Sequence, residues 1–187
     1  MFNLGRFFCI ILFIDLMKQN LNIRLAAKDD LPAIMDIFNQ AIRSRNACGF
    51  LEETDIEERQ AWFANHSKNS HPVYTAELNG KVVGYGSLSP YRPGRSAMRK
   101  VAEVSFFLDF NFHNKGVGTA LLSHMIRDCP RLEIESLIAI LLGSNYASIA
   151  LLRKHGFGEW GRMPGIIDFK DRICDHLYYG LKIKPVL

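Results

Sequence analysis

The apolar residues near the N-terminus first alternate as in a strand and then recur as in a helix. Residues 22–26 form the alternating stretch, and Asp29-Asp30-Leu-Pro after it combines an N-cap residue with an early proline. The helix itself is predicted from apolar positions three and four residues apart, namely Leu31, Ile34, Phe38, Ala41 and Ile42.

A second helix is predicted to begin at Thr54, because Thr-Asp-Ile-Glu has the residue types of a capping box. Trp62 lies on this helix, where it could line a pocket. We expect it to pack in the core.

The middle of the chain has the alternating pattern of strands. Residues 73–78 and 81–88 flank Asn79-Gly80, a dipeptide typical of a tight hairpin turn. Residues 89–98 contain two prolines and a glycine and are predicted to form a loop, and residues 100–109 a third strand of this group.

Helical and strand patterns then follow one another to the C-terminus. Helices are predicted for residues 116–127 and 145–155, the latter ended by Gly156, with an apolar strand at 135–142 between them. Two further strands are predicted at residues 157–167 and 172–183. The order β-α-α-β-β-β-α-β-α-β-β contains no repeat or linker, so residues 17–187 are predicted to be a single domain.

Residues 1–16 do not fit this pattern. They contain an apolar run, residues 7–14, that is too short to span a bilayer and is followed by no small-residue cleavage site. We expect an N-terminal extension upstream of a true start at Met17. An apolar arm that packs on the domain or on a second copy is the alternative.

Composition excludes several classes of protein. The chain of 187 residues is 48% hydrophobic and 22% charged, as in ordinary globular domains. A net charge of +4 without a basic run argues against nucleic-acid binding. The four cysteines are scattered and form no metal-binding pattern, so we expect reduced thiols, no metal and a cytoplasmic protein without membrane contact.

A strand, a glycine-containing turn and a helix follow one another at residues 100–127. The turn, His113-Asn-Lys-Gly-Val-Gly-Thr, precedes the helix directly. Unpaired N–H groups and the helix dipole make such a junction a phosphate site, and Gly116 and Gly118 let a ligand approach the backbone. The third glycine of a dinucleotide fingerprint is replaced by Leu121, and no Walker string occurs.

His113-Asn-Lys-Gly-Val-Gly-Thr-Ala resembles motif A of the GNAT acetyltransferases, and Asn145-Tyr-Ala-Ser-Ile-Ala-Leu-Leu-Arg-Lys-His-Gly-Phe resembles their motif B. The resemblance covers nearly the whole chain after residue 16. It implies an α/β (α+β) fold with a central mixed, mostly antiparallel twisted sheet and about four helices. It also implies that acetyl-CoA binds in a cleft between two splayed central strands.

Within the family, Ser89-Pro-Tyr-Arg-Pro and Met98-Arg-Lys-Val-Ala-Glu-Val-Ser resemble the phosphinothricin and methionine sulfoximine acetyltransferases. This similarity implies an N-acetyltransferase that acts on a small amino-acid-like amine, and it implies a homodimer. Arg92 and Arg99 would bind an anionic end of the substrate, or else lie solvated on a loop, and Phe50 could line the acceptor pocket.

The same resemblance assigns roles along the predicted cleft. Glu103 would be the general base, with a salt bridge to Arg99 or Lys100 as its alternative role. Asn145 would contact the cofactor, or else only cap its helix. The other expected cofactor-binding residues are Phe106, Phe107, Leu108, His113, Asn114, Lys115, Gly116, Val117, Gly118, Thr119 and Ser148. His113 departs from the usual Gln or Arg and could be an ordinary exposed histidine.

One expected group is missing. Many family members carry a Tyr or His that protonates the leaving thiolate, and Leu152 stands at that position. Either Tyr146, Tyr178 or Tyr179 substitutes for it, or the thiolate leaves without a dedicated acid. Three functions therefore stay open: acetylation of an amino-acid analogue by direct attack, acetylation of a peptide, protein or polyamine, and non-catalytic acyl-CoA sensing.

Overall fold

The computed structural model describes residues 20–183, and the N-terminal extension expected at residues 1–16 lies outside the described part. A seven-stranded sheet runs through the described chain in the spatial order β1-β2-β3-β4-β5-β7-β6. Neighbouring strands are antiparallel, except that β4 and β5 are parallel. The strands are β1 Leu21–Leu25, β2 Val73–Leu78, β3 Lys81–Pro90, β4 Val101–Leu108, β5 Ser136–Leu142, β6 Gly158–Asp168 and β7 Ile173–Lys182.

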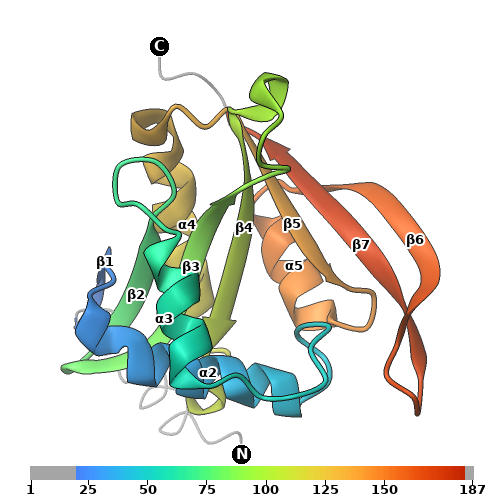
Figure 1. Ribbon diagram of the computed structural model, residues 1–187, viewed down its shortest axis with the longest axis horizontal. Helices are drawn as coiled ribbons and strands as arrows, with labels where there is room; N and C mark the ends of the chain where they lie inside the picture. The colour runs from blue at the N-terminus through green and yellow to red at the C-terminus, as the bar shows by residue number, and fades with distance from the viewer. Residues whose placement is uncertain (1–19, 184–187) are drawn as a thin grey trace, which may run out of the picture.

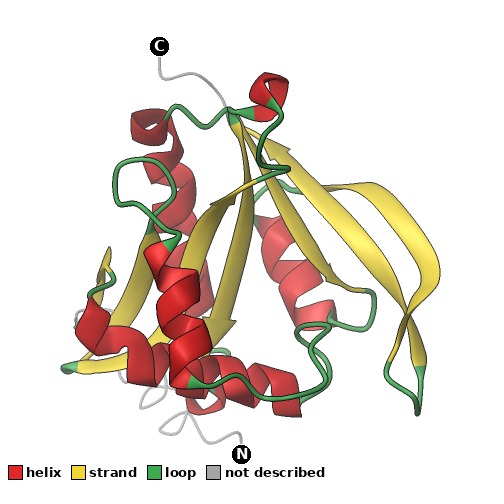
Figure 2. Cartoon of the chain, in the orientation of Figure 1, coloured by secondary structure: helices red, strands yellow, loops and turns green. Residues whose placement is uncertain are grey.

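Helices cover both faces of this sheet (Figures 1 and 2). The α-helices of the described residues are α2 Leu31–Arg43, α3 Ile56–Ala64, α4 Val117–Asp128 and α5 Tyr146–Lys154. Helices α2 and α3 pack on one face, and α4 and α5 pack on the other. The mixed, mostly antiparallel sheet with four helices confirms the predicted fold class. No helix between residues 20 and 183 is long and apolar enough to cross a bilayer.

Each face of the sheet has its own apolar core. On the α4 and α5 face, Leu121 and Met125 of α4 are fully buried against strand residues such as Leu88 and Leu137. On the α2 and α3 face, the buried cluster consists of Ile34, Ile37, Phe38, Ile42, Val73 and Tyr85. Because strand side chains alternate between the two faces, side chains two residues apart on β4 face the same core.

The predicted start of α2, with Asp30 as its N-cap residue and an early proline, is confirmed, and the predicted start of α3 needs a correction. Helix α3 is capped by Asp55, whose carboxylate accepts from the Glu58 N–H at 2.8 Å, and not by Thr54, which instead donates its hydroxyl to the Glu58 carboxylate. Asp30 does not cap α2 with its side chain either. It accepts from the Ala27 N–H at 2.7 Å and pairs with Arg24, because a neighbouring strand brings that cation within reach.

The predicted hairpin turn is confirmed. Asn79 and Gly80 have φ values of 50° and 77°, so both central residues adopt the left-handed conformation that a type I′ turn requires. The turn joins β2 directly to β3.

Strands β4 and β5 separate after a short stretch of pairing. Only three residue pairs join them, from Val101↔Ser136 to Glu103↔Ile138. Beyond Glu103, β4 continues beside β3 for five more residues while β5 continues beside β7. The separation leaves main-chain groups of β4 without a neighbouring strand.

The far end of the sheet is a two-stranded ribbon of β6 and β7 (Figure 1). The Trp160 indole lies on Gly180, where an added Cβ would come within 2.0 Å of the ring, so only glycine fits there. The ribbon exposes large apolar side chains to solvent, namely Trp160, Met163, Ile166 and Ile173.

Candidate functional site

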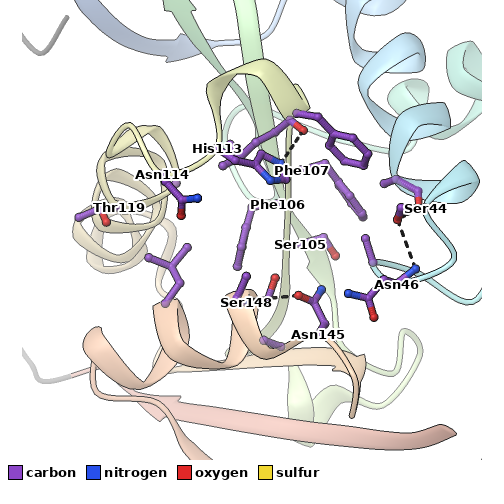
Figure 3. A pocket seen from close by; sticks show the side chains of 18 of the residues that line it. Ser44, Asn46, Ser105, Phe106, Phe107, His113, Asn114, Thr119, Asn145 and Ser148 are labelled. Carbon is purple, nitrogen blue, oxygen red and sulfur yellow. Dashed lines mark hydrogen bonds between the residues drawn. The ribbon is translucent and has the colours of Figure 1, made fainter. Parts of the chain in front are cut away.

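A cleft of about 390 Å³ opens where β4 and β5 separate (Figure 3). Its size is in the range of small-molecule sites. Residues from five parts of the chain line it: Ala41, Ser44, Asn46, Ala47, Val104, Ser105, Phe106, Phe107, Leu108, Phe110, His113, Asn114, Gly116, Gly118, Thr119, Ala139, Ile140, Asn145, Ala147, Ser148 and Leu151. The cleft passes from the start of α4, through the gap in the sheet, to the face covered by α2 and α3.

Main-chain donors of β4 face this gap. The Asp109 N–H bonds to Val83 on the β3 side, whereas the Lys100 carbonyl accepts from residues that precede and begin β5. Because main-chain groups alternate along a strand, those of Phe106 and Leu108 point toward the β5 side, where no strand pairs with them. Two N–H groups are thereby available to an oxygen in the cleft.

The start of α4 provides a second set of donors. Gly116 has φ 84° and forms the N-cap without a side-chain bond, and the first helical bond runs from the Ala120 N–H to the Gly116 carbonyl. The N–H groups of residues 117–119 are therefore free to bind an anion. A Cβ on Gly116 would meet no protein atom within 4 Å, so its side-chain direction opens to the ligand's side.

The residues around this turn divide into two groups. His113, Asn114 and Thr119 project into the cleft, and the His113 imidazole bonds to the Leu108 carbonyl at 3.3 Å (Figure 3). The Val117 side chain instead belongs to the buried core, and the Lys115 ammonium lies 5.0 Å from the Phe112 ring. Any contact of Val117 with a ligand would therefore involve its main chain.

Asn145 faces the cleft from the start of α5. Its carboxamide oxygen accepts from the Ser148 N–H at 3.1 Å, which makes it the N-cap of that helix. The capping role and the position on the cleft coexist, because the amide NH₂ is a separate group that points to the cleft side (Figure 3). Ser148, one turn later, lines the same wall.

Glu103 is the last β4 residue before the strands separate, and its side chain lies on the α2 and α3 face with Ser105 and Phe107. Burial raises the pKa of its carboxyl group above the ordinary value. The alternative salt bridges are not formed, because Lys100 pairs with Glu135 and Arg99 bonds to the Ser96 carbonyl. A half-buried carboxylate without a cationic partner suits proton transfer.

His66 and Ser89 adjoin this carboxylate, since Ser89 is the cross-strand neighbour of Glu103. The His66 Nδ1–H donates to the Trp62 carbonyl at 2.8 Å, so its Nε2 accepts from the Ser89 hydroxyl at 3.1 Å. Burial lowers the pKa of His66, and the charge of Arg59 acts in the same direction. The imidazole is therefore neutral at neutral pH. Trp62 packs in the aromatic cluster of this face, as expected.

The predicted substrate residues come from two separate segments, the loop after α2 and the segment between β3 and β4. Arg92 and Arg99 are exposed on the segment between β3 and β4, and Arg92 has a left-handed φ of 54°. Phe50 is 54% exposed and contacts the Phe38 ring at 5.4 Å. None of the three lines the cleft itself.

The tyrosines considered as acids occupy other places. Tyr146 is 77% exposed, and the buried Tyr179 hydroxyl bonds to Arg153 and Glu159. Neither they nor Tyr178 line the cleft, and Leu152 is buried in the core. Within residues 20–183, no tyrosine takes the place of the missing acid at the cleft.

Sequence reasoning missed one wall of the cleft. Ala41 of α2 and Ser44, Asn46 and Ala47 of the following loop line it opposite α5, and the Ser144 hydroxyl donates to the Asn46 amide oxygen at 2.7 Å across the opening. No motif marks these residues. A run of small and polar side chains after a helix was the only signal.

The comparisons identify the class of protein that this fold and cleft define. Residues 32–157 match the model of the Acetyltransferase (GNAT) family. The match spans more than half of the chain, so the chain belongs to this family and is an N-acetyltransferase.

Individual relatives give a narrower placement. The chain is 41% identical over 164 residues to YwnH of Bacillus subtilis, provisionally named a phosphinothricin acetyltransferase, covering 87% of this chain and 96% of that protein. It is 31% identical over 165 residues to the L-methionine sulfoximine/L-methionine sulfone acetyltransferase of Pseudomonas aeruginosa, covering 88% and 95%.

A solved structure shares the architecture. The phosphinothricin acetyltransferase of Sinorhizobium meliloti in complex with acetyl-CoA superposes with a TM-score of 0.82 at 28% identity, covering 89% of this chain and 94% of that one. The resemblance read from the two motifs is therefore confirmed at the level of the family and of its phosphinothricin and methionine sulfoximine branch.

Proposed function

We propose that this enzyme transfers the acetyl group of acetyl-CoA to the amine of a small, anionic, amino-acid-like substrate. One observation carries the proposal: the cleft runs from an anion-binding helix start through the gap between β4 and β5 to Val104 and Ser105, the residues that follow Glu103 on β4. A relative of the same fold binds acetyl-CoA. Two other relatives act on methionine sulfoximine and methionine sulfone or carry a phosphinothricin name.

The residues of the cleft fit the two ends of acetyl-CoA. The free N–H groups of residues 117–119, with the αL glycine before them, would hold the diphosphate. Asn145 and Ser148 would border the pantetheine arm, with His113 and Asn114 on the opposite wall. The N–H groups of Phe106 and Leu108 point to where the thioester carbonyl would lie and would polarise it. Phe107 would contribute its side chain to the wall of the cleft.

Glu103 would act as the base of a direct transfer. The substrate ammonium loses its proton to the carboxylate, directly or through a water, and the free amine attacks the thioester carbon. The new C–N bond forms, the C–S bond breaks, and the departing thiolate takes up the proton that the new amide nitrogen loses, through water and without a dedicated side-chain acid. Burial raises the pKa of Glu103, which brings it closer to the pH at which a general base accepts a proton in a neutral solution.

The anionic end of the substrate would be bound by exposed arginines. Arg92 and Arg99 belong to the exposed segment between β3 and β4, and guanidinium groups bind carboxylate or phosphinate through paired hydrogen bonds. Phe50 would pack on the aliphatic part of the acceptor.

The test is release of free CoA thiol with methionine sulfone, methionine sulfoximine, phosphinothricin, spermidine and a lysine peptide. We expect turnover with the amino-acid analogues. Arg92→Gln should lower kcat/KM for them at least about tenfold, because it removes a bidentate charged contact. Arg127→Gln on the far face is the control. Turnover confined to spermidine or the peptide would contradict the substrate class, and acetyl-CoA binding without any turnover would indicate a sensor.

We also propose a homodimer. The β6–β7 ribbon exposes Trp160, Met163, Ile166 and Ile173 on a single projecting element, and an exposed apolar patch of this kind usually marks an interface. A second copy is the natural partner, because a two-fold axis pairs such a patch with itself.

Ile173→Glu should halve the mass measured by sedimentation equilibrium at micromolar protein, because it places a charge on a side chain that is 69% exposed. Leu25→Glu introduces the same charge at the opposite edge of the sheet and should leave the mass unchanged. A wild-type chain that sediments as a monomer would refute the dimer.

A further inference from the structure

Arg59 is a buried cation whose charge no acidic residue of the described part of the chain balances. It lies on α3, is 8% exposed, and its guanidinium carbon is 4.3 Å from the Phe38 ring centre and 5.0 Å from that of Trp62. Its Nε is fully buried without a hydrogen-bond partner. Among residues 20–183 it takes part in no ion pair.

The groups around Arg59 are neutral. Burial raises the pKa of the Tyr85 hydroxyl and of the Cys48 thiol, against the smaller opposite effect of the Arg59 charge. Burial and the same charge lower the pKa of His66. All three groups are uncharged at neutral pH. Since buried charges in native proteins are normally paired, this cation is expected to have an anionic partner that is not part of the described chain.

Arg59 is also next to the acceptor face. The Phe38 ring, on which its guanidinium lies, contacts Phe107 at 5.0 Å and Phe50 at 5.4 Å. Phe107 lines the cleft, and Phe50 is exposed. An acceptor molecule above Ser105 and Phe107 would therefore lie one aromatic layer from Arg59, and contact with the guanidinium requires the exposed Phe50 ring to turn aside when the acceptor binds.

We infer that Arg59 binds the carboxylate of the acceptor and selects for amino-acid substrates; this inference rests on the function proposed above. The planar guanidinium matches a carboxylate with two parallel hydrogen bonds, and stacking on Phe38 and Trp62 fixes its orientation beforehand. Arg92 then acts at the variable, solvent-exposed end of the substrate. The two arginines recognise different groups of one molecule.

The experiment compares Arg59→Met and Arg59→Lys with the wild type on methionine sulfone and on its carboxamide, which differ only in the carboxylate. We expect Arg59→Met to raise the KM for the acid at least about 30-fold, toward that of the carboxamide, since a charged bidentate bond is lost. The KM for the carboxamide and the KM for acetyl-CoA should stay within twofold. Arg59→Lys keeps the charge without the fork and should lie between.

Stability separates this role from a structural one. Because no acidic residue between residues 20 and 183 pairs with Arg59, Arg59→Met should melt at the wild-type temperature or above it. Arg131→Met is the matched control, because Arg131 is exposed and pairs with Asp128 after α4, on the opposite face of the sheet from the acceptor. It should leave all kinetic constants unchanged.

Four results would overturn the inference. Equal loss of activity on the acid and the carboxamide, together with a lower melting temperature, would make Arg59 a packing residue. An effect on phosphinothricin alone would move its ligand from the carboxylate to the phosphinate. A wild-type enzyme inactive on every amino-acid analogue would refute the proposed function and this inference together, whereas activity that Arg59→Met leaves intact would refute the inference alone.

Discussion

Glu103→Gln should lower kcat/KM for acetyl transfer at neutral pH by at least about 100-fold, the usual contribution of a general base. The amide retains the shape of the side chain but accepts no proton from the ammonium. Acetyl-CoA affinity, measured by calorimetry, should not change, because Glu103 lies outside the cleft. Glu135→Gln serves as the control. It removes an exposed carboxylate that directly precedes β5 and pairs with Lys100, and it should keep full activity.

The raised pKa of Glu103 also fixes the direction of two pH effects. The acid limb of the kcat/KM profile should lie above the ordinary pKa of glutamate, because activity requires the charged form that burial disfavours. A folded pKa above the unfolded one stabilises the protein below the unfolded pKa, and this stability is lost as pH rises through the folded pKa. Glu103→Gln should therefore gain melting temperature relative to the wild type as the pH rises above the ordinary pKa of glutamate, because the wild type loses stability there. A difference that is constant as the pH rises would contradict the assignment.

Gly116→Asp should weaken acetyl-CoA binding by at least about 100-fold relative to Gly116→Asn. Both residues tolerate the left-handed φ of 84° better than other side chains, so backbone strain is nearly the same in the two variants. They differ in charge, and a carboxylate about 4 Å from a phosphate is opposed by a few kcal/mol even when partly screened. Isothermal titration with acetyl-CoA measures the difference directly.

The same pair of variants separates binding from folding. A carboxylate at a helix N-terminus stabilises the helix, so Gly116→Asp should melt no lower than Gly116→Asn although it binds the ligand less tightly. Equal affinity of the two variants would mean that the diphosphate does not bind at this turn.

Local requirements of the backbone explain which parts of this structure the sequence predicts. Asn79-Gly80 and Gly116 need positive φ, and Asn145 caps the helix that follows it, so residue type alone locates these turns. The N-cap error at Thr54 and the missing side-chain cap at Asp30 have the opposite origin. In each case a neighbouring side chain from another element, or from the next turn, satisfies the oxygen that the pattern assigned to the helix.

Two features of the site depend on tertiary placement and have no local signal. Ser44 and Asn46 reach the cleft only because α2 ends opposite α5, and small polar residues after a helix are common everywhere. Arg59 resembles any solvated charge on an amphipathic helix until the fold turns it inward against Phe38. Glu103, by contrast, is recognisable because a carboxylate among apolar strand residues is unusual.

The short junction between β4 and β5 divides the sheet into two arms that are joined at one end. Strands β1–β4 form one arm and β5–β7 the other, and in the sheet three residue pairs at one end act as the pivot. A ligand lying between the arms contacts both, so its binding free energy also holds the two arms together. The cellular level of such a ligand would then set how long the two arms stay together, with the occupied protein more stable by RT ln(1 + [L]/Kd).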